Sequence, residues 1–300
     1  MYIKEIHLLT HRSDLKALPN RKLIINTINA HSFNVAQKDT LFAEALISSD
    51  VLLPDGAGIV KAVKWLKNET IERITGWDLF CFEMDKLNKK RGVCFFLGSS
   101  VKVLELILKK SAEDYPNVRM IGYSPRYRSD FTEVENKSMI EDIHAANPDL
   151  ILIGMTAPKQ EKWSYLHYDL LNVNCHICAI GAVFDFYAGT MKRAPFWWQQ
   201  HSLEWLYRLI IEPRRMWKRY IIGNFLFLCY IFKEKFFTRQ SASDCLQPEL
   251  KILSLNEQGR YAIVTRFPTL SEAKKHAGKL QAAGITCEII DTGNGSEYNY

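Results

Sequence analysis

The chain has 300 residues, 47% of them hydrophobic and 24% charged, with a net charge of +6. This composition indicates a globular protein of about two domains and excludes disordered, collagen-like and disulfide-stapled chains. No run of ~18 uninterrupted apolar residues predicts a membrane-spanning helix, and the N-terminal residues lack the apolar stretch of a signal peptide. We expect a cytoplasmic protein.

Short β-rich runs alternate with helix-length stretches before residue 200. The predicted strands cover residues 22–26, 51–54, 93–98, 118–123, 149–155 and 176–182. Apolar residues recur at helical spacing over residues 32–49, 101–116 and 131–148. Alternation of helices with nearly continuous apolar strands predicts a Rossmann-like α/β fold, a parallel sheet with helices on both faces.

Ligands of such a sheet bind beyond the carboxyl ends of the strands, where the strand-to-helix loops lie. Five of these loops carry polar residues and glycine, and we expect them to form one composite pocket. They cover residues 27–29, 55–58, 98–100, 156–161 and 184–189.

The loop after the second predicted strand partly matches the glycine fingerprint of a dinucleotide-binding site, but the match is incomplete. Gly56 and Gly58 are not followed by the third glycine of the fingerprint, because Lys61 stands in its place. Asp55 would in addition repel a pyrophosphate. Asp55 is either a turn residue next to Pro54 or a general base that faces the pocket.

Three other motifs allow two interpretations each. Residues 98–100, Gly-Ser-Ser, suit either a phosphate cradle or a helix N-cap. Lys159 and Gln160 lie at a helix start, yet capping does not require them, and they offer a charge and an amide to a ligand. Asp185 and Arg193 form either a structural ion pair or part of the pocket.

The seven cysteines are an odd number scattered through apolar segments, as in a reducing compartment. Cys175 and Cys178 form a single C-x-x-C, and one pair cannot complete a tetrahedral zinc site. We expect no metal site and no cofactor.

The whole net charge lies in one segment. Residues 205–239 hold eight basic and two acidic side chains, a net of +6, which indicates an anionic partner. The apolar run over residues 221–232 is too short to span a bilayer, but among tryptophans and phenylalanines it suits a helix in a membrane interface. It argues against single-stranded nucleic acid. The alternative is a packed helix with a solvated face.

Seven motifs, in this order, resemble the WecG/TagA/CpsF family of glycosyltransferases over about residues 1–237: PDGAGIVKA, RITGWDL, FFLGSS, YPNVRMIGYSP, IGMTAPKQEKW, AIGAVFDFYAGTMKRAP and LEWLYRLIIEPRRMWKRY. The resemblance implies inverting, metal-independent transfer of an N-acetylmannosamine-type sugar or related hexose. The donor would be a UDP-sugar and the acceptor an undecaprenyl-diphosphate-linked sugar. The enzyme would act at the inner membrane face, in synthesis of exopolysaccharide, capsule, enterobacterial common antigen or teichoic acid linkage units.

The resemblance also implies roles for individual residues. Asp55 becomes the base that deprotonates the acceptor hydroxyl. The substrate-binding residues are Thr27, Asn29, Arg73, Lys159, Gln160, Asp185 and Arg193, and the tail residues that hold the lipid diphosphate are Arg208, Arg214 and Arg219. The chain has no D-x-D motif for a nucleotide-bound metal, and Thr156 departs from the glycine usual in the family.

Three parts are predicted. Residues 1–195 form the catalytic domain, residues 196–240 a helical, basic-aromatic membrane appendage, and residues 241–300 a linker and a small α+β module that faintly resembles half of a SPOR-type repeat. The competing interpretation is a non-catalytic or redox nucleotide-binding protein with a membrane-docking tail.

Overall fold

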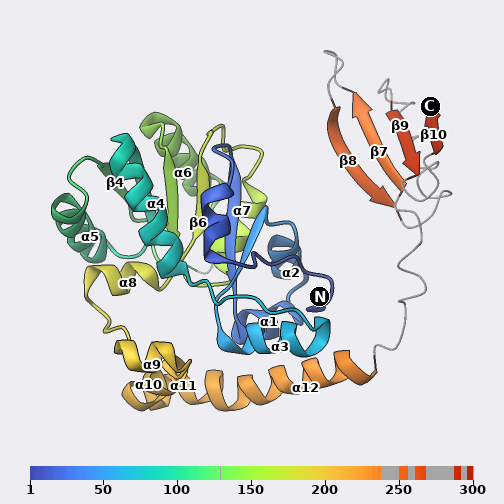
Figure 1. Ribbon diagram of the computed structural model, residues 1–300. Coiled ribbons are helices and arrows are strands. Elements are labelled where there is room, and N and C mark those ends of the chain that lie inside the picture. Colours follow the sequence, from blue (N-terminus) through green and yellow to red (C-terminus); the bar gives the residue numbers. More distant parts are fainter. Residues whose placement is uncertain (129, 238–249, 256–260, 268–286, 292–295, 300) are drawn as a thin grey trace. The chain divides into compact units, whose positions relative to one another are not determined.

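The structure, a computed structural model, describes residues 1–128, 130–237, 250–255, 261–267, 287–291 and 296–299. It forms two compact units, Met1–Glu234 and Lys235–Tyr300 (Figure 1). The first unit contains the predicted catalytic domain and most of the predicted appendage. The three-part division of the chain stays a prediction.

A six-stranded sheet lies at the centre of the first unit, in the order β2-β1-β6-β5-β3-β4. Its strands are β1 Leu23–Ile28, β2 Val51–Pro54, β3 Val93–Gly98, β4 Arg119–Tyr123, β5 Leu150–Gly154 and β6 His176–Ala179. All pairings are parallel, and β2, β5 and β6 are buried along their whole length. Continuous apolar strands are what burial on both faces requires.

Helices cover both faces of this sheet. They are α1 Ala30–Ala36, α2 Thr40–Ile47, α3 Ala57–Lys67, α4 Gly76–Lys90, α5 Val101–Asp114, α6 Glu133–Ala146, α7 Lys159–Leu166 and α8 Val183–Ala188. Neighbouring residues of β1 point to opposite faces, since Ile25 packs with α4, α5 and α8 whereas Ile24 packs with α6 and α7. The predicted Rossmann-like α/β fold is confirmed.

Two local boundaries differ from the prediction. The helix expected over residues 32–49 is two helices, because the Asp39 carboxylate accepts a hydrogen bond from the backbone N–H of Phe42 and starts α2. Strand β1 continues to Ile28, so Thr27 lies in the strand and not in the loop after it.

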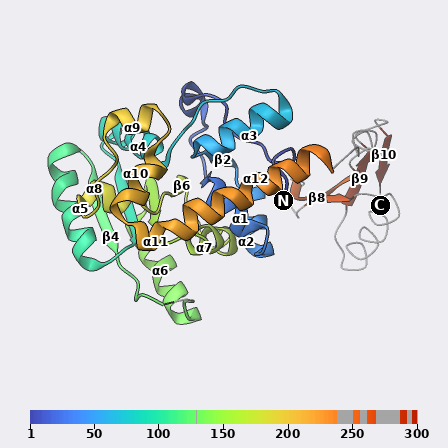
Figure 2. The ribbon, with the colours of Figure 1, turned by 90° about the horizontal axis from the view of Figure 1, so that it is seen from below.

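The appendage is a chain of short helices that ends in a long one. Its elements are α9 Phe196–Gln200, α10 Glu204–Ile211, α11 Pro213–Trp217, a π-helical turn η2 Lys218–Ile222 and α12 Gly223–Phe236. Seen from below, α12 passes across α1 and near α3 (Figure 2).

Helix α12 is part of the hydrophobic core of the first unit. Phe227 and Ile231 are 3% and 2% exposed and pack with residues of α1, α2 and α3. The Phe227 ring meets the Phe33 ring edge-on at 5.4 Å. At the far end of the helix, the buried Glu234 carboxylate accepts hydrogen bonds from the backbone N–H groups of Ile3 and Lys4 at 3.0 and 2.8 Å. Phe227 therefore packs inside the protein, which corrects its assignment to a surface that contacts lipid.

The second unit contains a four-stranded antiparallel sheet in the order β10-β9-β7-β8. Its strands are β7 Leu250–Leu255, β8 Tyr261–Phe267, β9 Cys287–Asp291 and β10 Ser296–Asn299. Strands are present where the α+β module was expected, whereas the residues between β8 and β9, where a helix of that module would lie, are outside the described residues.

Phe227→Ala should lower the free energy of unfolding of the first unit by about 3–5 kcal/mol, because it leaves a cavity between α12 and the catalytic core. Phe225→Ala is the matched control, since Phe225 is 70% exposed on the same helix and its loss should change stability by no more than about 0.5 kcal/mol. Urea unfolding followed by circular dichroism measures both. Equal stability of the two variants would show that α12 does not contribute to the core in solution.

Candidate active site

The loops that follow β1 and β2 lie side by side at the carboxyl edge of the sheet. The backbone N–H of Asp55 donates to the carbonyl of Ile28 at 2.9 Å, and Thr27 pairs with Leu53 in the parallel ladder. The Asn29 side chain accepts hydrogen bonds from two backbone N–H groups and caps α1. Two of the five predicted pocket loops are thus in contact.

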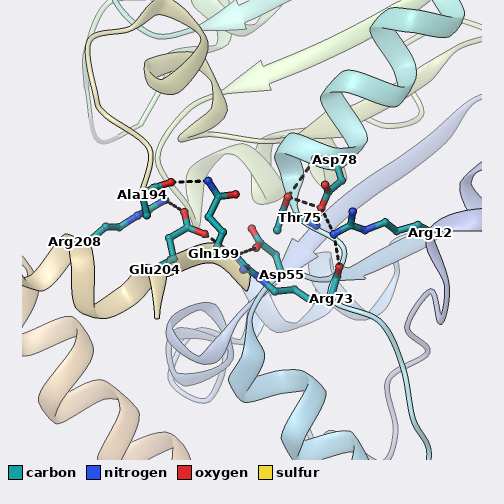
Figure 3. Close-up of polar contacts among 9 residues, drawn as sticks. All are labelled: Arg12, Asp55, Arg73, Thr75, Asp78, Ala194, Gln199, Glu204 and Arg208. Carbon is teal, nitrogen blue, oxygen red and sulfur yellow. Dashed lines mark hydrogen bonds and ion pairs between the residues drawn. The ribbon is translucent and has the colours of Figure 1, made fainter. Parts of the chain in front are cut away.

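Asp55 lies in a cluster of two carboxylates and two arginines, the carboxylate–arginine cluster (Asp55, Arg73, Glu204 and Arg208; Figure 3). A terminal nitrogen of Arg73 lies 3.8 Å from Asp55 Oδ1 and 2.7 Å from Glu204 Oε2. Arg208 donates to the other Glu204 oxygen at 3.1 Å. Since Glu204 and Arg208 lie on α10, the appendage contributes half of this cluster.

The backbone around Arg73 is fixed from two sides. The N–H of Ile74 donates to the carbonyl of Pro54 at 3.2 Å, which ties this segment to the end of β2. The Arg12 guanidinium donates to the Arg73 carbonyl at 3.3 Å and lies 3.4 Å from the Asp78 carboxylate. Asp78 in turn closes the capping box of α4 with Thr75 (Figure 3).

Burial by the surrounding protein raises the pKa of Asp55 above the ordinary aspartate value. The charges of Arg73 and Arg208 and the hydrogen bond from the Gly76 N–H lower this pKa, whereas the charge of Glu204 raises it further. The side chain still exposes 29% of its surface. A partly accessible carboxylate of raised pKa can accept a proton from a substrate hydroxyl.

Two further arginines are electrostatic neighbours of Asp55. Burial lowers the pKa of Arg193 and of Arg219, and the charge of Asp55 acts against both shifts. The Arg193 guanidinium lies over the Trp77 ring. The Nε atoms of Arg73 and Arg219 are buried without a hydrogen-bond partner. Because buried donors are normally paired, these atoms indicate a site built for an anion that the arginines would hold.

Among the described residues, two that were predicted to bind substrate and one predicted to hold the lipid diphosphate make no hydrogen bond or ion pair with this cluster. The Lys159 ammonium donates to the Arg128 carbonyl at 2.7 Å and lies over the Phe131 ring. Asp185 accepts a hydrogen bond from Thr190 and makes no ion pair with Arg193 in the described part of the chain. Arg214 is exposed on α11.

Gln160 is buried and its amide is already engaged. Its oxygen accepts from the Gly181 N–H at 3.1 Å, and its nitrogen donates to Glu161 Oε1 at 2.9 Å. Gln160 thereby joins the loops after β5 and β6. Burial raises the pKa of Glu161 to about 7, and its second oxygen has no partner.

Sequence reasoning did not single out Glu161, Glu204 or His31. Glu161 lies in the first turn of α7, where an acidic residue is an ordinary part of a helix start. Glu204 directly precedes the basic segment over residues 205–239, in which the prediction concerned only the arginines as binding residues. His31 follows the Thr27–Asn29 motif, and burial together with Arg219 lowers its pKa to about 4, so its ring is neutral near pH 7.

Within the residues that the structure describes, no helix is long and apolar enough to cross a bilayer. The same residues contain no group of three metal-ligating side chains.

A model of the glycosyl transferase WecG/TagA/CpsF family matches residues 6–241. The chain belongs to this family. It is a glycosyltransferase, which confirms the enzyme class predicted from the motifs and disfavours the non-catalytic or redox alternative.

Three similar proteins share the name N-acetylglucosaminyldiphosphoundecaprenol N-acetyl-beta-D-mannosaminyltransferase. The Bacillus subtilis (strain 168) protein is 36% identical over 196 residues, which cover 65% of this chain and 74% of that protein. The Bacillus spizizenii protein (strain ATCC 23059 / NRRL B-14472 / W23) is 33% identical over 67% and 75% of the two chains. The Staphylococcus aureus protein (strain NCTC 8325 / PS 47) is 28% identical over 68% and 78%.

Arg219→Gln should weaken the binding of inorganic pyrophosphate by about 10- to 100-fold, because a charge-assisted hydrogen bond in a buried site contributes ~1.5–3 kcal/mol. Arg215→Gln is the matched control: it removes the same charge from an exposed side chain paired with Glu212. Isothermal titration calorimetry measures both variants. An equal loss of affinity in both would mean that only the net charge of the appendage matters.

Proposed function

We propose that this glycosyltransferase moves an N-acetylmannosamine-type sugar or related hexose from a UDP-sugar to a polyprenyl-diphosphate-linked sugar, with inversion at the anomeric carbon. The observation that carries the proposal is a partly accessible carboxylate of raised pKa, Asp55, surrounded by arginines at the edge of a parallel sheet. The names of the three relatives describe transfer of an N-acetylmannosaminyl group to a diphosphoundecaprenol-linked sugar, which supports this choice of acceptor and sugar.

In the proposed mechanism Asp55 accepts the proton of the acceptor hydroxyl while the oxygen of that hydroxyl attacks the anomeric carbon of the donor sugar. The bond from that carbon to the UDP oxygen breaks, and its electron pair leaves with the diphosphate. Direct displacement of this kind inverts the configuration. Arginine stabilises the developing charge well, because its planar donors match phosphate oxygens two at a time.

The remaining predicted site residues keep their proposed roles. Arg193, together with Arg73, lies close enough to Asp55 to meet the leaving diphosphate. Arg208 and Arg219 would hold the lipid diphosphate of the acceptor, and Arg214 would extend this charge toward the membrane. For the pocket wall we retain Thr27, Asn29, Lys159, Gln160 and Asp185.

We also propose that the appendage rests on an anionic membrane surface. Exposed apolar side chains recur at the spacing of one helical stripe, with Ile221 in η2 and Phe225, Leu228, Phe232 and Phe236 in α12. Such a stripe next to basic side chains suits a helix that lies in the membrane interface. This position would bring the appendage arginines to the headgroup level, where a lipid-linked diphosphate is found.

Asp55→Asn should lower kcat by roughly 10²–10⁴ and leave the affinity for the UDP-sugar nearly unchanged, because only proton transfer is lost. UDP release is measured with a short-chain polyprenyl-diphosphate-GlcNAc acceptor and a panel of UDP-sugars. Calorimetry with UDP and a thermal melt show whether the variant binds and folds normally. Near-normal turnover of a folded variant would exclude Asp55 as the base.

The double variant Phe225→Ser, Leu228→Ser should bind vesicles that contain anionic phospholipid at least roughly tenfold more weakly, since it removes two apolar side chains from the lipid-facing stripe. The control, Val134→Ser with Leu166→Ser, replaces two exposed apolar side chains on α6 and α7. Vesicle flotation compares the two proteins. Equal binding by both would contradict the proposed membrane face.

A further inference from the structure

Arg73 is shared unequally between two carboxylates. The same terminal nitrogen lies 2.7 Å from Glu204 and 3.8 Å from Asp55, so it is hydrogen-bonded to Glu204 and only in loose contact with Asp55. The carboxylate proposed to act as the base is therefore not the one that receives the strong charge-assisted hydrogen bond.

This inequality matters for a general base. A carboxylate in a tight ion pair with arginine holds a proton poorly, since the adjacent cation favours its charged form. A base of low proton affinity is also a weak base in the transition state. Tight pairing of Arg73 with Asp55 would thus suppress the function proposed for Asp55.

We propose that Glu204 is a positioning residue, which holds the Arg73 guanidinium away from Asp55 and so keeps Asp55 able to accept a proton. The inference rests on the proposed role of Asp55 and extends it. Because Glu204 lies on α10, the base reaches its working state only when the appendage is docked on the catalytic core.

Glu204 is held more firmly than the arginine that it binds. Its second oxygen accepts a hydrogen bond from Arg208, one helical turn further along α10, and its side chain is only 12% exposed. The Arg208 guanidinium in turn lies over the Phe186 ring. Arg73 has a fixed backbone, and its Nε atom makes no hydrogen bond, so no bond at that atom has to break for the guanidinium to move toward Asp55 when Glu204 is neutralised.

The charges that face Asp55 set the sign of the expected effect. Four arginines on four segments favour its charged form: Arg73, Arg193, Arg208 and Arg219. The Gly76 N–H does the same, whereas burial and the charge of Glu204 oppose them. Removal of the Glu204 charge leaves only burial against the arginines and frees Arg73 to approach. The pKa of Asp55 must then fall.

The test is the pH dependence of kcat/KM for the full-length enzyme. In Glu204→Gln the acidic limb of this profile, where activity falls because Asp55 becomes protonated, should move about one pH unit lower. The value of kcat at higher pH, where the profile is flat, should fall about three- to tenfold, because Asp55 becomes a weaker base. The KM for the UDP-sugar should not rise, because no cation is lost. Glu212→Gln, which removes a carboxylate from the exposed pair with Arg215, should keep the wild-type profile.

Glu204→Asp provides a second measurement that keeps the charge. Its carboxylate is one methylene shorter and holds Arg73 less closely, so the acidic limb should move in the same direction by a smaller amount. This variant decides the question if Glu204→Gln does not fold.

A merely structural role for Glu204 would lower activity and the melting temperature together, without moving the acidic limb. An unchanged or upward-shifted limb in a folded Glu204 variant would overturn the inference. Asp55→Asn separates the two proposals: normal turnover of that variant rejects both, whereas loss of turnover together with an unchanged limb in Glu204→Gln rejects the positioning role alone.

Discussion

The Phe227 side chain packs against α1 and α3, and this contact anchors the last helix of the appendage on the catalytic core. Phe227 meets Phe33 edge-on and lies against Gly58, where an added Cβ would come within 3.4 Å of its ring. Gly58 belongs to the same loop and helix start as Asp55. This hydrophobic contact thus places α12 against the start of the helix that follows the loop of the proposed base.

The two interpretations of the aromatic segment, a packed helix or a membrane helix, concern different faces of α12. The buried face carries Phe227, Ile231 and Glu234, at the i, i+4, i+7 spacing of a core stripe. The opposite face keeps a second apolar stripe that the fold leaves exposed. A helix that is apolar nearly all round is unusual on the surface of a soluble domain. Packing accounts for one stripe, and the proposed membrane surface would account for the other.

The sheet and most of the helices could be predicted because parallel strands buried on both faces leave a strong signal in the chain. Residues 51–54 and 93–98 were located to the residue. The break before Asp39 was missed because the apolar periodicity continues across it, even though Asp followed by Thr is a normal helix start. Asp55 could be singled out as a polar residue after a buried strand, but the residues alone left a turn role equally open, and its predicted role as the base came from the family resemblance.

Glu204 could not be found in this way. Its partner Arg73 is 131 residues away in the sequence, and no local pattern distinguishes a carboxylate that reaches back over a pocket from one that offsets charge on a basic helix. The same holds for Gln160, where sequence analysis predicted a ligand-binding amide but not its bonds to Glu161 and Gly181. Local sequence spacing shows which polar side chains could contribute to a site. Which of them contact one another depends on how the appendage packs on the catalytic core.

The charge balance of the site explains why the contacts between appendage and core side chains are important. Arg73, Arg193, Arg208 and Arg219 lie near Asp55 and Glu204, and the charge of Asp78 also acts on Arg73 and Arg193. Burial removes water from the charged guanidinium groups and lowers the pKa of Arg193 and of Arg219, and the charges of neighbouring arginines lower both pKa values further. Glu204 relieves part of this repulsion through its bonds to Arg73 and Arg208, and a bound diphosphate would relieve the rest. Glu204 therefore adds to the negative charge of Asp55 and Asp78 near these arginines before substrate binds, and the four arginines still carry more charge than the three carboxylates, which would attract a diphosphate.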